Sequence, residues 1–511
     1  MKPGWMKCLL IGGGVMVLVF VVLMASIQAI FVATVEGELK LQDEKPIMDA
    51  FTAPPVSIFM SFYLFNVTNA RDVQYYNETP ILQEIGPYVY EEFREKFSME
   101  FDDSGNAISY KQKKYYTFRE DLSGKWKESD EVTTLNVVMV MMAALGYHKT
   151  GINLIWPEIE RTMNVFETFT VGEALFQGWD LPSDLNFNFS GTGIPGTENI
   201  IFEGSLGDIL LQLGVEEDQI PPPLIENKIG YFSLLNDTDD GWWKVSTGRA
   251  DMDEYLYVRE YHNDTQLHYW NDIYCDMING TDGTQFPPFR MDENSVVRIF
   301  VPQLCRSLYL LYVTTNTSQV AVPAVRNNCP HSSHLMVRSP GPHSSHLMVW
   351  SPGPHSSHLM VRSPGPHSSH LMVWSPEIPI IMSTPHFYQG NYSDVDMYVG
   401  LEPEKELHET YLDLETSFGV PLAAHKRIQI NLPLRKFGKL PSFQNIDREY
   451  NFPVFWADEW AEVSSDDAKM IKLGLDIPMI VYIVAGILTL VGCTMMGVGG
   501  YKRYKLKRSS V

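Results

Sequence analysis

Two long apolar runs, one near each end, most constrain what this chain can fold into. The first extends from Cys8 to Val35 and the second from Ile477 to Tyr501, and neither contains a charged residue. A helix needs about 20 apolar residues to cross the hydrocarbon core of a bilayer, where charges are costly. The first run is longer than the apolar core of a cleaved signal peptide, about 7 to 15 residues. Both runs are therefore predicted to be retained transmembrane helices, at 8–35 and 477–501.

The distribution of charge orients these two predicted helices. Lys2 and Lys7 precede the first run, five Lys and Arg residues follow the second, and all 62 Asp and Glu residues lie between the runs. Basic segments next to transmembrane helices stay on the cytosolic side. We therefore expect cytosolic tails at 1–7 and 502–511, and an ectodomain at 36–476 that faces the lumen or the outside of the cell.

The ectodomain is strongly acidic. Because seven of the 39 Lys and Arg residues lie in the tails, the segment between the runs carries a formal net charge of −30. Such a surface repels nucleic acid and does not adhere broadly to anionic lipid surfaces. Any site for an anionic ligand must then be a local basic patch.

Modification motifs agree with this topology. Eight Asn-x-Ser/Thr triplets are predicted glycosylation sites, and all lie in the ectodomain: Asn66, Asn77, Asn188, Asn236, Asn263, Asn279, Asn316 and Asn391. Cys8, at the cytosolic margin of the first run, is a predicted palmitoylation site. The ectodomain holds Cys275, Cys305 and Cys329 in an oxidising compartment. An odd number leaves at least one of these thiols unpaired or bridged elsewhere.

The ectodomain has the texture of one strand-rich domain with a local group of helices. Alternating or β-branched runs predict strands within 56–67, 115–118, 255–261, 296–301, 307–314 and 427–432. Apolar spacings of three and four predict helices at 136–145, 152–169 and 171–177.

A tandem repeat interrupts this texture at 330–376. The unit PHSSHLMVRSPG, with Trp replacing Arg in alternate copies, begins at Pro330, Pro342, Pro354 and Pro366. Each copy offers only Leu, Met and Val for burial among Pro, Gly, Ser and His, too little for a solenoid. We expect an exposed and poorly ordered insert.

Signatures of catalysis are missing. The sequence holds no P-loop, no His-Glu-x-x-His and no Gly-x-Ser-x-Gly motif. The acidic pair Glu91 and Glu92 is interpreted as solvated surface, and His386 and His408 as isolated structural residues. We therefore expect no enzyme, no catalytic residue, no cofactor and no metal site. In the first span, Ala25, Ala29 and Ala33 form a small-residue stripe suited to close helix approach, within one chain or between two.

Five short motifs and their order along the chain are informative. They are FYLFNVT at 62–68, GPYVY at 86–90, CDMINGTDG at 275–283, CRS at 305–307 and PHF at 385–387. In these motifs and in its two-anchor topology the chain resembles the class B scavenger receptor family. The segment IMSTPHFYQ at 381–389 resembles most closely the lysosomal integral membrane protein branch.

The resemblance implies an α+β membrane protein with one transmembrane helix at each end. Its ectodomain would have a β-barrel-like core, a helical apex at 136–177 far from the membrane, and an internal apolar tunnel. Receptors of this family bind lipoproteins, fatty acids, sterols or anionic phospholipids. Carried over to this chain, the ligand-binding cation falls on Arg161, with Lys149 nearby. A cation beside an apolar mouth suits a carboxylate or phosphate headgroup, and a solvated helix face is the alternative for Arg161.

Two departures from the family pattern bear on folding and location. The resemblance pairs Cys275 with Cys329 and leaves Cys305 alone, because the repeat replaces the stretch that holds the other cysteines. The C-terminal tail lacks an acidic dileucine signal, which favours the plasma membrane over a lysosomal or endosomal membrane.

Three functions remain open at this stage. The first is a scavenger-type receptor that transfers fatty acid or sterol lipid to the membrane. The second is a lysosomal sorting receptor carrying a lumenal hydrolase, and the third is an adhesive protein without a tunnel. Homo-oligomerisation is left open as well.

Overall fold

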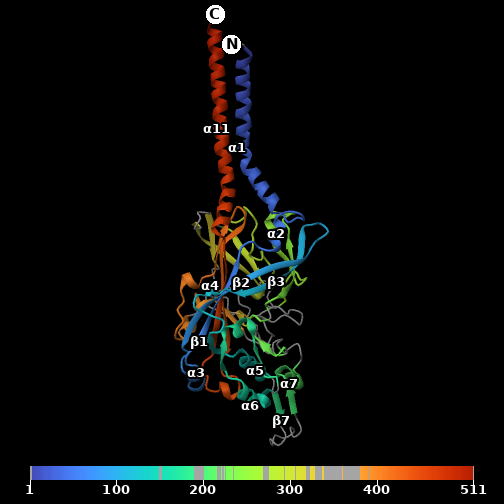
Figure 1. The fold of residues 1–511 in the computed structure, drawn as a ribbon, viewed down its shortest axis with the longest axis vertical. Coiled ribbons are helices and arrows are strands. Elements are labelled where there is room, and N and C mark those ends of the chain that lie inside the picture. Colours follow the sequence, from blue (N-terminus) through green and yellow to red (C-terminus); the bar gives the residue numbers. More distant parts are fainter. Residues whose placement is uncertain are drawn as a thin grey trace.

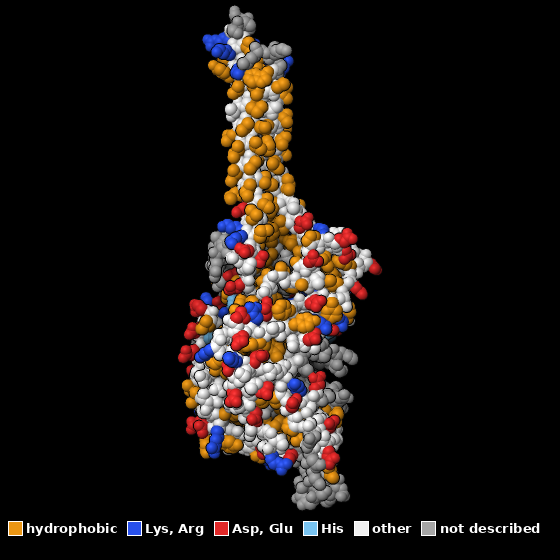
Figure 2. Space-filling model, viewed as in Figure 1, with side chains coloured by type: hydrophobic (Ala, Val, Ile, Leu, Met, Phe, Trp, Pro, Cys, Tyr) orange, Lys and Arg blue, Asp and Glu red, His pale blue; other side chains and the backbone are white. Residues whose placement is uncertain are grey.

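Both apolar runs form long helices that lie side by side on one end of a strand-rich body (Figure 1). Helix α1 comprises Pro3–Leu39 and helix α11 comprises Ser465–Ser509, so each extends beyond its expected span. Figure 2 shows apolar side chains along the helix pair and basic side chains near its free end. The computed structural model describes residues 3–148, 152–183, 185–188, 201–215, 220, 224, 226–233, 235–268, 276–292, 294–304, 306–317, 323–328, 337–338, 359–360, 380–390 and 392–509.

Glycines, rather than the predicted alanine stripe, bring α1 and α11 together. A Cβ atom built on Gly13 would lie 2.6 Å from the carbonyl oxygen of Gly492, and one built on Gly492 would lie 3.0 Å from the carbonyl oxygen of Gly13. Ala25, Ala29 and Ala33 are exposed on α1 and take no part in this contact. Small residues allow membrane helices to approach closely, and here the glycines are the ones in register.

A single large antiparallel sheet forms the body. Among the described residues it has 14 strands, eleven of which follow one path. In spatial order these are β11 (Val258–Tyr261), β10 (Thr238–Ser246), β3 (Ala107–Phe118), β2 (Leu82–Phe101), β1 (Ile58–Val67), β20 (Tyr450–Glu462), β19 (Val420–Leu434), β18 (Tyr411–Glu415), β14 (Pro323–Asn328), β13 (Arg306–Thr317) and β12 (Val296–Val301). Each predicted strand coincides with part of a strand on this path, although β1 begins at Ile58 and β11 at Val258, two and three residues later than expected.

The expected barrel is not closed by a strand ladder within the described part of the chain. Its edge strands β11 and β12 are instead joined through a short non-strand segment at Gly280 and Thr281. Val258 of β11 donates its N–H to the carbonyl of Gly280 at 2.8 Å, and Phe300 of β12 donates to Thr281 at 2.8 Å. The core is therefore an open sheet that curls until one loop bridges its edges.

The predicted helical apex lies at the end of the body away from α1 and α11 (Figure 1). It contains α5 (Val137–His148), α6 (Ile152–Thr162) and a π-helical turn, η1 (Glu173–Gln177). Helix α5 is apolar all round and is buried from 137 to 144, as expected for such a helix. The expectation of helix to 169 is wrong, because β5 (Phe166–Thr170) pairs with β4 (Glu131–Leu135). Tertiary pairing here outweighs the apolar spacing.

Shorter helices, 3-10 turns and strands flank the sheet and its two ends. The helices are α2 (Ile47–Thr52), α3 (Ala70–Tyr76), α4 (Glu120–Ser123), α7 (Leu206–Gln212), α9 (Tyr392–Val395) and α10 (Lys405–His408), with 3-10 turns η3 (Met252–Glu254), η4 (Pro302–Leu304), η6 (Pro385–Phe387) and η7 (Pro441–Phe443). The remaining strands are β6 (Trp179–Asp180), β7 (Leu185–Asn188), β8 (Ile201–Gly204), β9 (Lys228–Ile229), β15 (Val337–Arg338), β16 (Leu359–Met360) and β17 (Ile381–Ser383). Strands β15 and β16 belong to the repeat; they pair with each other, and β15 also pairs with β17. The rest of the repeat lies outside the described residues.

One buried apolar cluster connects the sheet to the helical end. The ring of Phe62 on β1 lies edge-on to Tyr90 on β2, to Phe176 of η1 and to Phe232, with centroid distances of 4.8 to 5.8 Å. Such aromatic contacts add to the burial of the rings themselves. This packing fixes the helical end relative to the cavities described next.

Candidate ligand cavity and helical end

The larger cavity lies on the membrane-proximal side of the sheet and has a volume of about 540 Å³. This volume is within the roughly 300–1,000 Å³ typical of small-ligand sites. Its walls are mainly apolar and come from the end of α1, from α2, and from strands of both halves of the sheet. They include Leu39, Ile47, Phe51, Leu256, Ile299, Leu308, Leu310, Leu412, Ala424 and Ala461. The cavity therefore offers a mainly apolar surface suited to hydrocarbon.

Phe418 connects this cavity to both membrane helices. Its ring lines the cavity and lies 6.2 Å, centroid to centroid, from Phe31 of α1. On the other side, a Cβ atom built on Gly474 of α11 would lie 2.9 Å from the tip of the Phe418 ring. The buried carboxylate of Glu415 holds the turn by accepting the N–H groups of Ser417 and Phe418, both at 2.8 Å. The membrane-proximal wall of the cavity thus rests directly on the spans.

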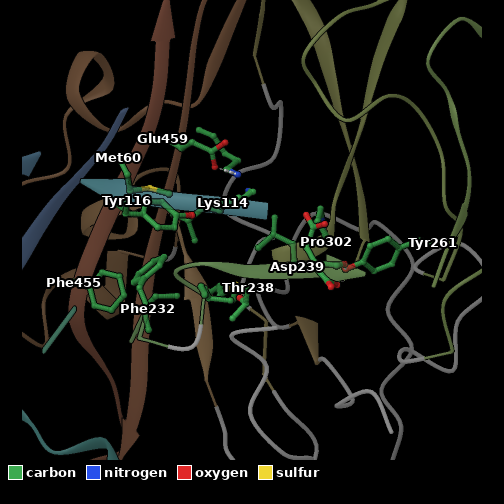
Figure 3. Close-up of a pocket in the computed structure, with 18 residues that line it drawn as sticks. Met60, Lys114, Tyr116, Phe232, Thr238, Asp239, Tyr261, Pro302, Phe455 and Glu459 are labelled. Carbon is green, nitrogen blue, oxygen red and sulfur yellow. Dashed lines mark hydrogen bonds and ion pairs between the residues drawn. The ribbon is translucent and has the colours of Figure 1, made fainter. Parts of the chain in front are cut away.

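A smaller cavity, about 80 Å³, adjoins the larger one on the side of the helical end. Figure 3 shows its apolar side chains, among them Met60, Phe232 and Phe455, together with Lys114 and Glu459. The two cavities share five lining residues: Lys114, Asp240, Pro302, Lys426 and Glu459. Their junction is therefore polar, whereas the space on either side is apolar.

The junction belongs to a buried network of ion pairs. Arg94 on β2 contacts Glu92 at 2.6 Å and also binds Glu459 on β20. Lys426 on β19 binds Glu459, directly opposite it in the ladder. Lys114 on β3 lies 3.4 Å from Glu92. The same network extends to Lys96, whose Nζ is 3.7 Å from Asp282.

Burial and these contacts shift the titration of the network. Burial raises the pKa of Asp240 to about 6, and Lys114 opposes that shift. Burial lowers the pKa of Lys426 despite the nearby Glu459 carboxylate. Burial alone would raise the pKa of Glu459, but Lys426 and Arg94 hold it well below its ordinary value. Among these groups, Asp240 is the one that takes up a proton in mild acid.

The interpretation of Glu92 as solvated surface is wrong. Glu92 is 3% exposed and faces the network, whereas its neighbour Glu91 pairs with Arg119 at the surface. The sequence did contain evidence for this charged face. Glu92, Arg94 and Lys96 occupy every second position, so one face of a strand carries all three charges. Glu92 was expected to be exposed to solvent on the basis of composition alone, because the ectodomain is strongly acidic.

The comparison with known proteins agrees with this architecture. The model of the CD36 family matches residues 10–502, nearly the whole chain. The chain belongs to the CD36 family. This family membership and the relatives below confirm the class B scavenger receptor resemblance and a two-span membrane protein.

Three relatives show the kinds of protein to which this CD36-family chain is similar. Lysosome membrane protein 2 of Rattus norvegicus is 27% identical over 88% of this chain and 84% of its own length. Sensory neuron membrane protein 2 of Manduca sexta is 28% identical over 89% of this chain and 85% of its own. Scavenger receptor class B member 1 of Bos taurus is 23% identical over 86% and 78%. Family and relatives support a scavenger receptor role.

Arg161 lies at the helical end and not in either cavity. It sits in the last turn of α6, its side chain is 74% exposed, and it pairs with Glu158 one turn earlier. The neighbouring Glu160 has a structural role, since its Oε1 accepts the indole N–H of Trp156 and the N–H of Ser442, both at 2.7 Å. Lys149 lies outside the described residues, and the ligand-binding role of both cations stays a prediction.

The predicted modification sites are distributed over the ectodomain surface. Asn236 and Asn263 are exposed, and Asn77 and Asn279 are half-buried. Asn66 is also half-buried and accepts the N–H of Thr133 at 2.9 Å through Oδ1. Asn188 and Asn316 lie in β7 and β13, and Cys8 is exposed on α1. Asn391 and the cysteines at 275, 305 and 329 lie outside the described residues, so these predictions stand as made.

The two histidines expected to be isolated in fact stack on each other. The ring centroids of His386 and His408 are 4.3 Å apart, and His386 Nε2 lies 2.6 Å from a carboxylate oxygen of Glu84. Both side chains are buried. Burial and the neighbouring His386 lower the pKa of His408 to about 3. The pair supports the fold beside Trp456 and lines neither cavity.

Proposed function

We propose that this CD36-family protein is a scavenger-type receptor that binds lipid-bearing or anionic ligands at its helical end and passes fatty acid or sterol lipid through the cavities to the membrane. The observation that carries the proposal is Phe418, which lines the larger cavity and contacts both membrane helices, α1 at Phe31 and α11 at Gly474. A lipid leaving the cavity there meets the apolar surface of the helices without crossing water.

The capture step is assigned to the helical end because Arg161 is exposed there. Among the described residues its guanidinium pairs with Glu158 on its own helix, and such exposed pairs are weak and readily exchanged. A carboxylate or phosphate ligand competes for the same donors.

Blocking the cavity tests the transfer step. Ala424 and Ala461 face each other across β19 and β20, and both line the larger cavity. In cells expressing equal surface amounts, Ala424→Phe should lower uptake of labelled oleate and cholesteryl ester severalfold by filling this space. Ala423→Phe is the matched control, because its side chain points to the opposite face of β19. Equal uptake by the two variants would sink transfer through the cavity.

A second candidate is a sorting receptor for a lumenal hydrolase, favoured by the likeness to lysosome membrane protein 2. It requires lysosomal residence and a bound hydrolase, and it does not require an open cavity. Imaging of the full-length chain and purification of its lumenal partners test it. A lysosomal location with a co-purifying hydrolase, and uptake indifferent to Ala424→Phe, would favour this second function.

A further inference from the structure

The junction between the two cavities is built around a lysine that is weakly engaged by the protein itself. Lys114 lines both cavities, and its side chain is 12% exposed. Its ion pair with Glu92 spans 3.4 Å, and the same carboxylate oxygen already receives Arg94 at 2.6 Å. An ammonium group has three donors. Lys114 is therefore placed to offer a hydrogen bond to something inside the cavity.

The other cations of the network are held more tightly. Arg94 bridges two carboxylates, and Lys426 binds Glu459 directly. Lys96 donates to the carbonyl oxygen of Phe51 at 3.0 Å and lies over the Phe51 ring. A ligand binding to any of these would have to break strong buried contacts, whereas binding to Lys114 displaces only its long contact with Glu92.

The space next to Lys114 is shaped for a chain with one charged end. Apolar walls extend into the larger cavity from the junction, and Ile299, Leu308 and Leu310 form part of them. A buried carboxylate is costly unless a cation or donor meets it. A neutral lipid of the same length carries no charge for the cation to pair with.

We propose that Lys114 is a headgroup subsite inside the cavity, which binds the carboxylate of a single-chain lipid anion while the hydrocarbon chain lies in the larger cavity. This subsite rests on the proposed lipid-transfer function and gives it a preference for free fatty acid over neutral lipid. The nearby acids Asp240 and Glu459 oppose the ligand's charge, so the subsite holds its ligand without trapping it.

Equilibrium binding of labelled oleate and of oleyl alcohol to the purified full-length chain in lipid nanodiscs tests the subsite. Lys114→Met should weaken oleate binding at least about tenfold, the scale of a lost charge-assisted hydrogen bond, and leave oleyl alcohol unchanged. Lys113→Met is the matched control, since Lys113 is 36% exposed, pairs with Asp237, and lines neither cavity. Lys114→Arg should restore much of the oleate affinity.

Asp240→Asn tests the subsite through an expected increase in oleate binding, which a misfolded variant would not show. Removing this charge beside Lys114 should strengthen oleate binding and leave oleyl alcohol unchanged. Oleate binding that neither Lys114→Met nor Asp240→Asn alters would overturn the subsite and leave lipid transfer standing. If the wild-type chain binds neither lipid, the subsite and the proposed function fail together.

Discussion

Gly13 of α1 lies so close to Gly492 of α11 that a Cβ atom at Gly13 would be 2.6 Å from the Gly492 carbonyl oxygen. The two spans are thus joined by backbone contact within the membrane. Since Phe418 rests on both spans at the base of the cavity, the geometry of the helix pair and that of the cavity mouth are connected.

A side chain at Gly13 should therefore separate the helices. Gly13→Val is expected to lower the free energy of unfolding by about 1–3 kcal/mol, the usual cost of overpacking. Gly12→Val is the control, because a Cβ there meets only the end of Met495 at 4.0 Å. Thermal unfolding of both full-length variants in nanodiscs measures the difference, and identical midpoints would contradict the glycine contact.

The buried ion network predicts a strong effect at Arg94. Arg94→Met removes the bridge between Glu92 and Glu459 and leaves the buried Glu92 carboxylate with its 3.4 Å contact to Lys114, while Glu459 keeps Lys426. We expect a loss of about 3–5 kcal/mol in unfolding free energy. Arg259→Met, which breaks an exposed pair with Glu254, should cost less than about 1 kcal/mol. Denaturant titration compares them, and a small loss at Arg94 would show that solvent reaches the network.

Substitutions of the neighbouring residues Glu160 and Arg161 on α6 should differ in their effect on stability. Glu160→Ala loses the bond from Trp156 within α6 and the bond from Ser442 that ties α6 to η7, at a cost of about 1.5–3 kcal/mol. Arg161→Ala alters an exposed side chain and should change stability by less than about 0.5 kcal/mol. A stable Arg161→Glu variant that loses lipoprotein binding would then place Arg161 in ligand capture, whereas retained binding would make it a solvated helix face.

Acidification should strengthen binding of a lipid anion. The pKa of Asp240 is about 6 because of burial, so the carboxylate is mostly ionised at pH 7.5 and mostly protonated at pH 5. Protonation removes the negative charge of Asp240, so this carboxylate no longer balances the positive charges of Lys114 and Arg94. A hexadecyl sulfonate probe, ionised throughout, should bind more tightly as the pH falls through 6. Binding is measured at both pH values.

Asp240→Asn separates this effect from other titrating groups. His425 also lines the larger cavity and pairs with Asp458. If Asp240 is responsible, the asparagine variant binds tightly at both pH values. A pH dependence of binding that survives in Asp240→Asn would show that Asp240 is not its cause.

The strands of the body were predictable where aromatic or β-branched residues follow one another, as in β1 and β12, and α5 was predictable because it is apolar all round. The expectation failed at 166–169, where FETF has a helical spacing but pairs as a strand with β4. It failed again at Glu92, where an acidic composition suggested solvent. In both places the outcome depends on partners distant in the chain.

The two membrane anchors and the family follow from contiguous stretches of sequence, because hydrocarbon burial is a property of a contiguous segment. The predicted orientation rests on the basic flanks of the same segments. Only the tertiary structure decided where the charges of the ectodomain go. Arg94, Lys114, Lys426 and Glu459 come from four strands that the curled sheet brings onto one inner face. Their pairing offsets a desolvation cost that none of them could bear alone, so no local pattern specifies the junction they form.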